Sequence, residues 1–183
     1  MKFTPLKLAG AYHIETTPFQ DQRGFFTRTF CENEFAEFGL KQHYVQANHS
    51  GTFGKGIIRG MHFQRPPHAE VKVIKCIKGS IFDVIVDCRK NSPTFLQWVG
   101  IELSAEKKNM MYVPEGFAHG FQSLEEETEM TYLVGAFYNK ESEGGIHHLD
   151  PKVGIEWPLP VLLTSEKDAA IPFVDDNFKA IDC

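Results

Sequence analysis

Three polar side chains interrupt a strand-like run in the stretch GIIRGMHFQ, residues 56–64. Arg59, His62 and Gln64 stand where a buried strand would carry valine or isoleucine, and Lys72 follows in the next apolar run. Burying such groups is costly unless they meet partners or a ligand. Taken alone, His62 is more often a structural residue, but this grouping predicts a polar pocket inside a barrel, with His62 as a candidate base.

A second motif, VPEGFAHGF at residues 113–121, has the pattern P-x-G-x-x-H and resembles the second motif of the cupin barrels. It opens a metal hypothesis, in which His62 and His119 bind an ion and Glu70 completes a facial set. The first cupin motif normally carries H-x-H, and here it reads His62-Phe63-Gln64, so one histidine is missing.

Two further residues have both an ordinary and a chemical interpretation. Tyr132 is an unremarkable strand tyrosine unless it faces the same cavity as an imidazole, where it would be a general acid. Arg23, in DQRGFF, is an exposed turn residue unless it joins Arg59 and Lys72 in holding a phosphate or diphosphate.

The elements that must position these residues are short β-branched and aromatic runs separated by Gly, Pro, Asn and Asp. Their spacing of about ten residues predicts an all-β antiparallel sandwich or barrel in one domain, residues 1–183. The runs are HYVQANHS, GKGIIRGMHFQ, VKVIKCIKG, SIFDVIVDC, LQWVGIEL, NMMYVPEG, EMTYLVGAFY and GGIHHL. Short helices are expected in ENEFAEFGL, ending at Gly39, and in TSEKDAAIP, with Ser165 as N-cap.

Two strand runs fix which side chains share a face. Gly79-Ser80 separates two apolar runs and predicts a type II′ hairpin. Alternation places Lys72, Ile74 and Cys76 on one face, with Val71, Val73 and Ile77 on the other. Tyr132 and Tyr138, six residues apart, are expected on the same face.

Composition excludes several classes of function. The 183 residues carry a net charge of −5, which gives no global attraction to nucleic acid or to an anionic membrane. No run is long and apolar enough to span a bilayer, and the first sixteen residues lack the apolar core of a signal peptide. The four cysteines form no C-x-x-C pair, which fits a cytoplasmic protein better than a disulfide scaffold.

The ordered set DQRGFF, QANHS, GIIRGMHFQ, VKVIKCIKGSIFDVIVDCRKNSPTF, WVGIELSAEKKNMMYVPEGFAHGF, TYLVGAFY, GIHHLDPKVGIEWPL and SEKD resembles the dTDP-4-dehydrorhamnose 3,5-epimerase family. The resemblance implies a cupin-type jelly-roll barrel, usually dimeric, with no metal or other cofactor. It also implies an isomerase of deoxysugar (rhamnose-type) biosynthesis that acts on a dTDP-linked sugar.

The resemblance implies a specific role for each residue of the site. His62 matches the catalytic base and Asp168, in SEKD, its partner acid, although by itself Asp168 reads as a surface acid in the first turn of a helix. Tyr132 matches the proton donor and Lys72 the cation near O4 of the sugar. The substrate-binding positions are Arg23, Phe26, Gln46, Asn48, Arg59, His119, Phe121, Tyr138, Glu143 and Lys167.

The chemistry agrees with these roles. A 4-keto sugar has acidic protons at C3 and C5, and removing either gives an enolate with its charge on O4. A neutral histidine is a suitable base near pH 7, and a carboxylate on its other nitrogen fixes the tautomer. A lysine would stabilise the enolate oxygen, and a tyrosine on the opposite side would return the proton.

Three positions depart from the family pattern, namely Arg28, Leu133 and Gly144, where glutamate, lysine and arginine are common. They leave open the nucleotide, the exact hexose and whether one carbon or two is inverted. A metal-dependent cupin and a non-catalytic sugar-binding barrel are the alternatives from other classes.

Strict alternation would place Arg59 and His62 on opposite faces of their strand. If both reach one ligand, the strand must break parity between them, and Gly60 is the expected site of a bulge.

Overall fold

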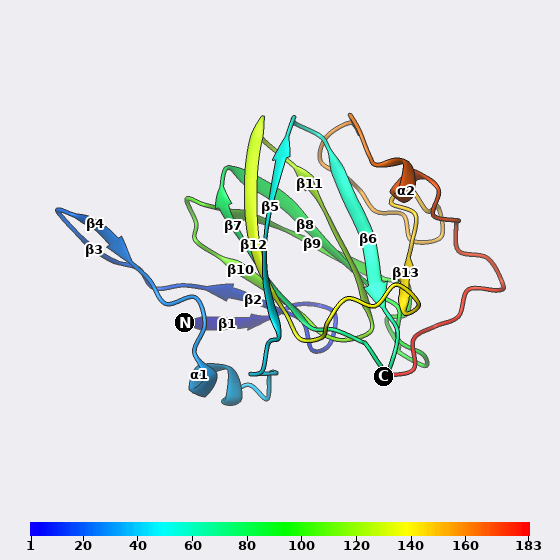
Figure 1. Ribbon diagram of the computed structural model, residues 1–183, viewed down its shortest axis with the longest axis horizontal. Helices are drawn as coiled ribbons and strands as arrows, with labels where there is room; N and C mark the ends of the chain where they lie inside the picture. The colour runs from blue at the N-terminus through cyan, green and yellow to red at the C-terminus, as the bar shows by residue number, and fades with distance from the viewer.

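Two antiparallel sheets face each other in the computed structural model, which describes residues 1–183 (Figure 1). The first has six strands, in the spatial order β1 (Lys2–Pro5), β2 (Tyr12–Glu15), β10 (Met110–Val113), β7 (Lys72–Lys78), β12 (Glu127–Val134) and β5 (Gln46–Phe53). The second has five, in the order β13 (Glu143–Gly145), β6 (Ile58–Gln64), β11 (Phe117–Ser123), β8 (Ser80–Asp87) and β9 (Trp98–Ser104). The predicted all-β, cupin-type antiparallel jelly-roll barrel is confirmed.

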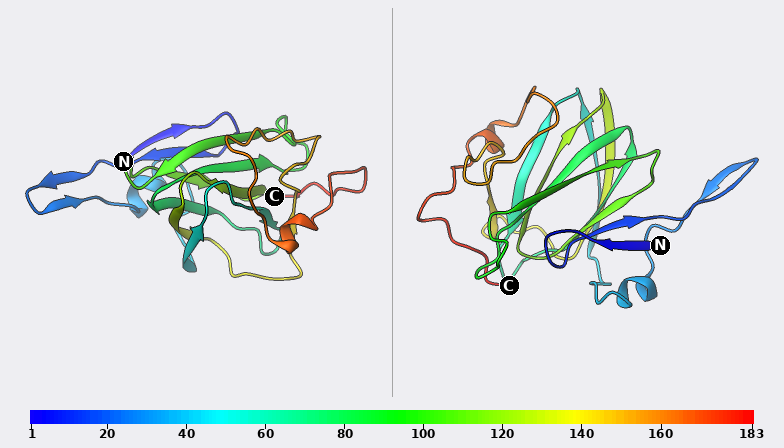
Figure 2. Two further views of the ribbon diagram at one scale, coloured as in Figure 1. Left: turned by 90° about the horizontal axis from the view of Figure 1, so that it is seen from above. Right: turned by 180° about the vertical axis from the view of Figure 1, so that it is seen from behind.

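The remaining elements lie outside the two sheets. Strands β3 (Phe19–Asp21) and β4 (Gly24–Phe26) form a separate ribbon that extends away from the barrel in every view (Figures 1 and 2). Helix α1 (Glu32–Ala36) lies below β1, and helix α2 (Glu166–Ala169) lies beside β6 (Figure 1). Both short helices lie where the sequence predicts them, although α1 ends at Ala36 and not at Gly39. Ser165 caps α2 as predicted, by accepting the N–H of Asp168.

The space between the sheets holds an apolar cluster, which is formed by side chains from both sheets. Ile74 and Cys76 of β7 join Ile81 and Ile85 of β8 in this cluster, and all four are fully buried. Val73, by contrast, belongs to a cluster on the outer face of the six-stranded sheet, together with Phe35 of α1. The predicted faces of β7 are therefore correct, and Lys72 starts the strand on the interior side.

The predicted hairpin at Gly79-Ser80 is wrong. β7 pairs with β10 and β12, whereas β8 pairs with β11 and β9, so the two strands belong to different sheets. Gly79 has a φ of 67°, and a Cβ there would lie 2.6 Å from the carbonyl oxygen of Glu127. The glycine therefore turns a corner of the barrel close to a neighbouring strand end, rather than closing a two-stranded hairpin.

The strand that carries Tyr132 is shorter than the predicted run EMTYLVGAFY. β12 ends at Val134, so Tyr138 lies in the following loop and parity with Tyr132 does not apply to it. The motif containing His119 is itself a strand, β11, and its buried aromatic residues point into the core.

The break in parity expected at Gly60 is present. His62 of β6 is opposite His119 of β11, but Arg59 is opposite Phe121, so β6 holds one extra residue between the two pairs. His119 and Phe121 are two residues apart and share the inner face of β11. Arg59 and His62 therefore lie on the same side of β6, with Gly60 at a φ of 130° between them.

None of the helices is long and apolar enough to cross a lipid bilayer.

We predict that Gly60→Ala destabilises the protein strongly, because a Cβ at this position would lie 2.5 Å from Cα of Gly120 and 2.9 Å from the carbonyl oxygen of His119. Gly24→Ala is a matched control, since Gly24 has a φ of 128° and nothing within 4 Å of its Cβ position. In urea titrations, the Gly60 variant should lose ~2 kcal/mol or more of unfolding free energy beyond the Gly24 variant. Equal losses would contradict the close approach of β6 and β11.

Candidate active site

His62 of β6 and Asp168 of α2 are in contact, although 106 residues separate them in the sequence. Nε2 of His62 and Oδ1 of Asp168 are 2.7 Å apart, and Oδ2 of Asp168 accepts the N–H of Gly60 at 3.1 Å. The bulge at Gly60 thus points a backbone donor at the same carboxylate that holds the imidazole. The capped turn of α2 fixes Asp168 from the other side.

The environment of Asp168 keeps it ionised at neutral pH. Its side chain is 5% exposed, and burial by itself would raise its pKa. Hydrogen bonds from His62, Gly60 and Ser165, with the charge of His62, outweigh burial and bring the pKa of Asp168 below its usual 3.8. An ionised carboxylate places the proton of a neutral imidazole on Nε2, which leaves Nδ1 of His62 with the lone pair of a base.

A second histidine–carboxylate pair lies next to the first. Nε2 of His119 is 2.7 Å from Oδ1 of Asp83, a residue of β8 that is fully buried. Sequence reasoning did not identify Asp83. The signal was its alternation with Ile81 and Ile85, which places a carboxylate on an otherwise apolar interior face.

The six-stranded sheet supplies the opposite wall of the same cavity. Lys72 of β7 and Tyr132 of β12 line a space of about 570 Å³ together with His62. The Lys72 ammonium is 3.0 Å from the carboxylate of Glu70, and both side chains are largely buried. Burial, then the charge of Glu70, raises the pKa of Tyr132, so its phenol remains protonated at neutral pH.

Several predicted binding residues line this cavity or its rim. Gln46, Asn48, Tyr138 and Glu143 contribute to the same lining. Arg59 lies in an adjoining hollow of about 560 Å³ with His62 and Asp168, and its guanidinium donates to the carbonyl oxygen of Gly51 at 3.0 Å.

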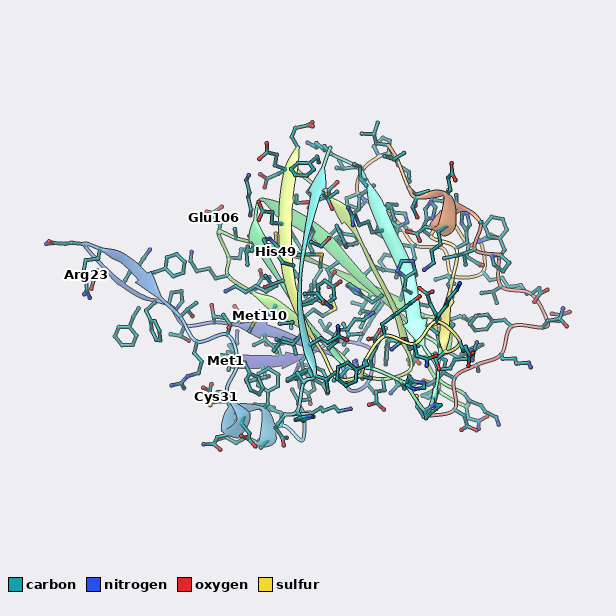
Figure 3. All side chains as sticks on the ribbon, in the orientation of Figure 1. Met1, Arg23, Cys31, His49, Glu106 and Met110 are labelled. Atoms are coloured by element: carbon teal, nitrogen blue, oxygen red, sulfur yellow. The ribbon has the colours of Figure 1, made fainter.

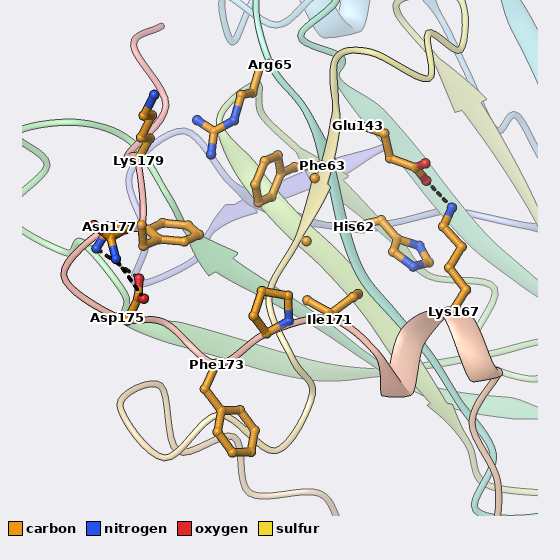
Figure 4. Close-up of a pocket in the computed structure, with 14 residues that line it drawn as sticks. His62, Phe63, Arg65, Glu143, Lys167, Ile171, Phe173, Asp175, Asn177 and Lys179 are labelled. Atoms are coloured by element: carbon orange, nitrogen blue, oxygen red, sulfur yellow. Dashed lines mark hydrogen bonds and ion pairs between the residues drawn. The ribbon is translucent and has the colours of Figure 1, made fainter.

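An ion pair between Lys167 and Glu143, 2.5 Å apart, crosses the rim beside His62 (Figure 4). The hydroxyl of Tyr138 donates to the same Glu143 at 3.0 Å. On the far side of the ion pair, a groove of about 630 Å³ runs beneath the C-terminal segment, with Arg65, Phe173 and Lys179 among its lining residues (Figure 4).

Gln64 has a structural role and not a chemical one, although it shares the inner face of β6 with His62. It is buried, donates to the carbonyl oxygens of His68 and Phe137, and accepts the N–H of Asn139 at 2.6 Å. All three contacts are with backbone, two of them in the loop that carries Tyr138. Gln64 therefore ties that loop to the barrel.

Within one chain, two predicted site residues lie away from the cavity. Arg23 and Phe26 belong to the projecting β3–β4 ribbon, where Arg23 is paired with Asp21 (Figure 3). Phe121 is the reverse case, because it is buried in the interior cluster opposite Arg59.

The three departures from the family pattern have distinct surroundings. Arg28 pairs with Glu34 of α1 at 2.8 Å, and Leu133 packs on the outer cluster of the six-stranded sheet. Gly144 lies opposite Phe63, and a Cβ there would be 2.3 Å from the phenyl ring. None of the three residues lines the cavity that contains Lys72 and Tyr132.

Each residue of the metal hypothesis contacts another side chain. His62 is bonded to Asp168, His119 to Asp83, and Glu70 to Lys72. No group of three or more His, Cys, Asp or Glu side chains is arranged to hold a metal ion. The geometry instead gives a base, a cation and a phenol around one cavity, which defines a site for acid–base chemistry on a small anionic or carbonyl compound.

The family follows from comparison with known proteins. The model of the dTDP-4-dehydrorhamnose 3,5-epimerase family matches residues 5–176, and the chain belongs to that family. The enzyme of that name from Salmonella typhimurium is 48% identical over 166 residues, which cover 88% of this chain and 89% of the relative.

Solved structures agree with the sequence comparison. A dTDP-4-dehydrorhamnose 3,5-epimerase from Elizabethkingia anophelis superimposes with a TM-score of 0.92 at 43% identity, covering 97% of this chain and 98% of its own. A dTDP-6-deoxy-D-glucose-3,5-epimerase from Legionella pneumophila, solved with dTDP-4-keto-L-rhamnose, has a TM-score of 0.88 at 39% identity and coverages of 94% and 92%.

We predict that Asp168→Asn destabilises the protein at neutral pH, by roughly 1–3 kcal/mol, because an uncharged amide replaces the buried carboxylate that contacts His62 and accepts the N–H of Gly60. The pKa of Asp168 is lower in the folded state than its usual 3.8, so its stabilising effect is present above that value and disappears as the pH falls through the folded pKa. Urea unfolding should therefore show the largest gap between wild type and variant above about pH 5 and a shrinking gap below 3.8. A gap that does not depend on pH would contradict the ionised state.

Proposed function

We propose that this chain is a dTDP-4-dehydrorhamnose 3,5-epimerase, which inverts C3 and C5 of a nucleotide-linked 4-keto-6-deoxy hexose without a cofactor. The observation that carries the proposal is the joint lining of one cavity by His62, Lys72 and Tyr132. Family membership and the Legionella relative, solved with dTDP-4-keto-L-rhamnose, support the same substrate class. We also propose a cytoplasmic enzyme, since its substrate is a nucleotide sugar and its four cysteines are free thiols.

The first step is removal of a proton α to the ketone. Nδ1 of His62 is the nitrogen left to act as base once Nε2 is bonded to Asp168. The ionised Asp168 then stabilises the imidazolium that forms. Removal of either the C3 or the C5 proton gives an enolate whose negative charge is on O4.

Lys72 is suited to stabilise that oxygen. It lies on the inner face of β7 opposite Val134 of β12, two residues from Tyr132, and both Lys72 and Tyr132 line the cavity. A fixed ammonium in a partly buried cavity interacts with a developing oxyanion more strongly than it would in water. We therefore expect stabilisation of O4 by Lys72 to contribute more to the rate enhancement than proton abstraction by His62 alone.

Inversion requires a proton to return from the opposite side of the sugar. His62 belongs to the five-stranded sheet and Tyr132 to the six-stranded sheet, so the two groups approach a bound sugar from facing walls. The raised pKa of Tyr132 keeps the phenol protonated until the enolate needs a donor. A base and an acid on facing walls are a requirement of epimerisation and have no use in simple binding.

The nucleotide portion is expected at the rim. Arg59 and Lys167 lie at the open side of the cavity, where a diphosphate linked to the sugar would emerge. Gln46 and Asn48 of the cavity lining are further polar groups for the sugar nucleotide, and Tyr138 supplies an exposed aromatic ring. His119, which is opposite His62 on β11, is expected to bind the same ligand.

The β3–β4 ribbon supports a homodimer in which each copy completes the other's site. Two strands alone bury little, and Phe19, Phe25 and Phe26 are 80%, 56% and 73% exposed on it. A second copy of the chain would cover these rings and bring Arg23 to the partner's cavity. This arrangement accounts for the distance of Arg23 and Phe26 from the cavity of their own chain.

Two substitutions test the catalytic assignment. His62→Ala should lower product formation from dTDP-4-keto-6-deoxyglucose by roughly a thousandfold, because no other group can accept the proton. Tyr132→Phe should slow product formation while exchange of C3 or C5 hydrogens with deuterated water continues. Equal affinity of both variants for dTDP, measured by calorimetry, serves as the control. Wild-type turnover by the His62 variant would show that the base is misassigned.

A mixing experiment tests the shared site. Arg23→Ala and His62→Ala are each expected to be nearly inactive alone. If the ribbon acts on the partner, a mixed dimer holds one intact site, so an equal mixture reassembled from unfolded chains should recover about one quarter of wild-type activity. No recovery, with mixed dimers demonstrated by native mass spectrometry, would place Arg23 in its own chain's site. A fully active Arg23→Ala enzyme would place Arg23 outside both sites.

A further inference from the structure

Glu70 is a largely buried acid of the cavity to which neither the fold nor the proposed reaction assigns a role. It lies two residues before Lys72, in the segment that enters β7, and its Oε1 is 3.0 Å from the Lys72 ammonium. The two side chains are 14% and 12% exposed, respectively. Both line the cavity together with His62 and Tyr132.

The ion pair explains how a lysine is held on this wall. Beyond Lys72, the interior face of β7 is formed by the fully buried Ile74 and Cys76. A solitary ammonium beside them would be drawn toward solvent or would lose its charge. The Lys72 ammonium forms an ion pair with Glu70. Because an ammonium has three N–H donors, this pair leaves capacity for a ligand oxygen.

The same carboxylate acts on the phenol across the strand pair. Burial is the largest influence on the pKa of Tyr132 and raises it, and the negative charge of Glu70 raises it further. Arg59 of β6 and a hydrogen bond with Asn48 of β5 act in the opposite direction. Glu70 therefore offsets the positive charge of Arg59, a residue that the bulge at Gly60 turns toward this side of the barrel.

Glu70 also completes a pattern in the barrel. Three basic side chains border the cavity or its inner wall, and each has its own carboxylate, namely His62 with Asp168, His119 with Asp83 and Lys72 with Glu70. The first two carboxylates each contact one ring nitrogen of a histidine, and the third pairs with an ammonium.

We propose that Glu70 is a positioning residue of the epimerisation, which holds the Lys72 ammonium where the enolate oxygen develops and places a negative charge on the cavity wall that carries Tyr132. The inference rests on the proposed function, because it gives Glu70 its effect through Lys72 and Tyr132. Glu70 itself does not touch the reacting atoms.

Glu70→Gln tests this role, because it keeps the size of the side chain and an oxygen acceptor for Lys72 but removes the charge. We expect kcat to fall about tenfold with KM within about twofold, since the lost interactions matter most when charge develops on O4. The alkaline limb of kcat should move to lower pH, because the phenol loses the negative neighbour that keeps it protonated. Glu70→Asp, which retains the charge, should keep the alkaline limb close to that of wild type.

Glu115→Gln is the matched control. Glu115 pairs with Lys41 at the same 3.0 Å, but neither residue lines the catalytic cavity. This variant should leave both kcat and its pH profile unchanged.

Two results would overturn the role of Glu70. One is a Glu70→Gln enzyme with the kcat and alkaline limb of wild type, or with a higher kcat. The other is an equal loss of kcat in the Gln and Asp variants with the alkaline limb unmoved, which would make Glu70 a folding residue only. If wild type itself does not epimerise the sugar nucleotide, the proposed function fails. If wild type does and Glu70→Gln matches it, only this inference fails.

Discussion

The contact between the imidazole of His62 and the carboxylate of Asp168 depends on three separate features of the chain. The capped turn of α2 must present Asp168, the extra residue at Gly60 must turn a backbone N–H toward the same carboxylate, and β6 must keep His62 on its inner face. Each feature is local, but they converge on two oxygen atoms. The position of the free nitrogen of His62, and with it the direction of proton transfer, follows from that convergence.

The rest of the cavity follows the same principle of paired charge in an apolar barrel. Polar groups on the interior faces beside the cavity have carboxylate or backbone partners, as Asp83 meets His119 and as three backbone groups meet Gln64. Pairing makes burial tolerable, and it also fixes orientation, which acid–base catalysis requires. The same contacts thus stabilise the fold and orient the catalytic groups.

Local patterns in the sequence predicted much of this architecture, and the errors have physical causes. Alternation identified the inner face of β7, and the demand that Arg59 and His62 share a ligand located the bulge at Gly60. The hairpin at Gly79 was wrong because a two-residue link does not reveal whether the chain stays in one sheet or turns into the next. Asp83 was missed although alternation marked it. The approach of Asp168 to His62, and the departure of Arg23 from the cavity, arise from long-range packing that no local pattern encodes.

The most direct test of the account follows the hydrogens of the substrate. Wild-type protein is incubated with dTDP-4-keto-6-deoxyglucose in deuterated water, and NMR records deuterium and configuration at each carbon of the sugar. We predict exchange and inversion at both C3 and C5, unaffected by a chelator. Exchange at C3 alone would restrict the enzyme to one carbon. Exchange at neither position, or exchange abolished by the chelator, would contradict a cofactor-independent epimerase built on His62 and Asp168.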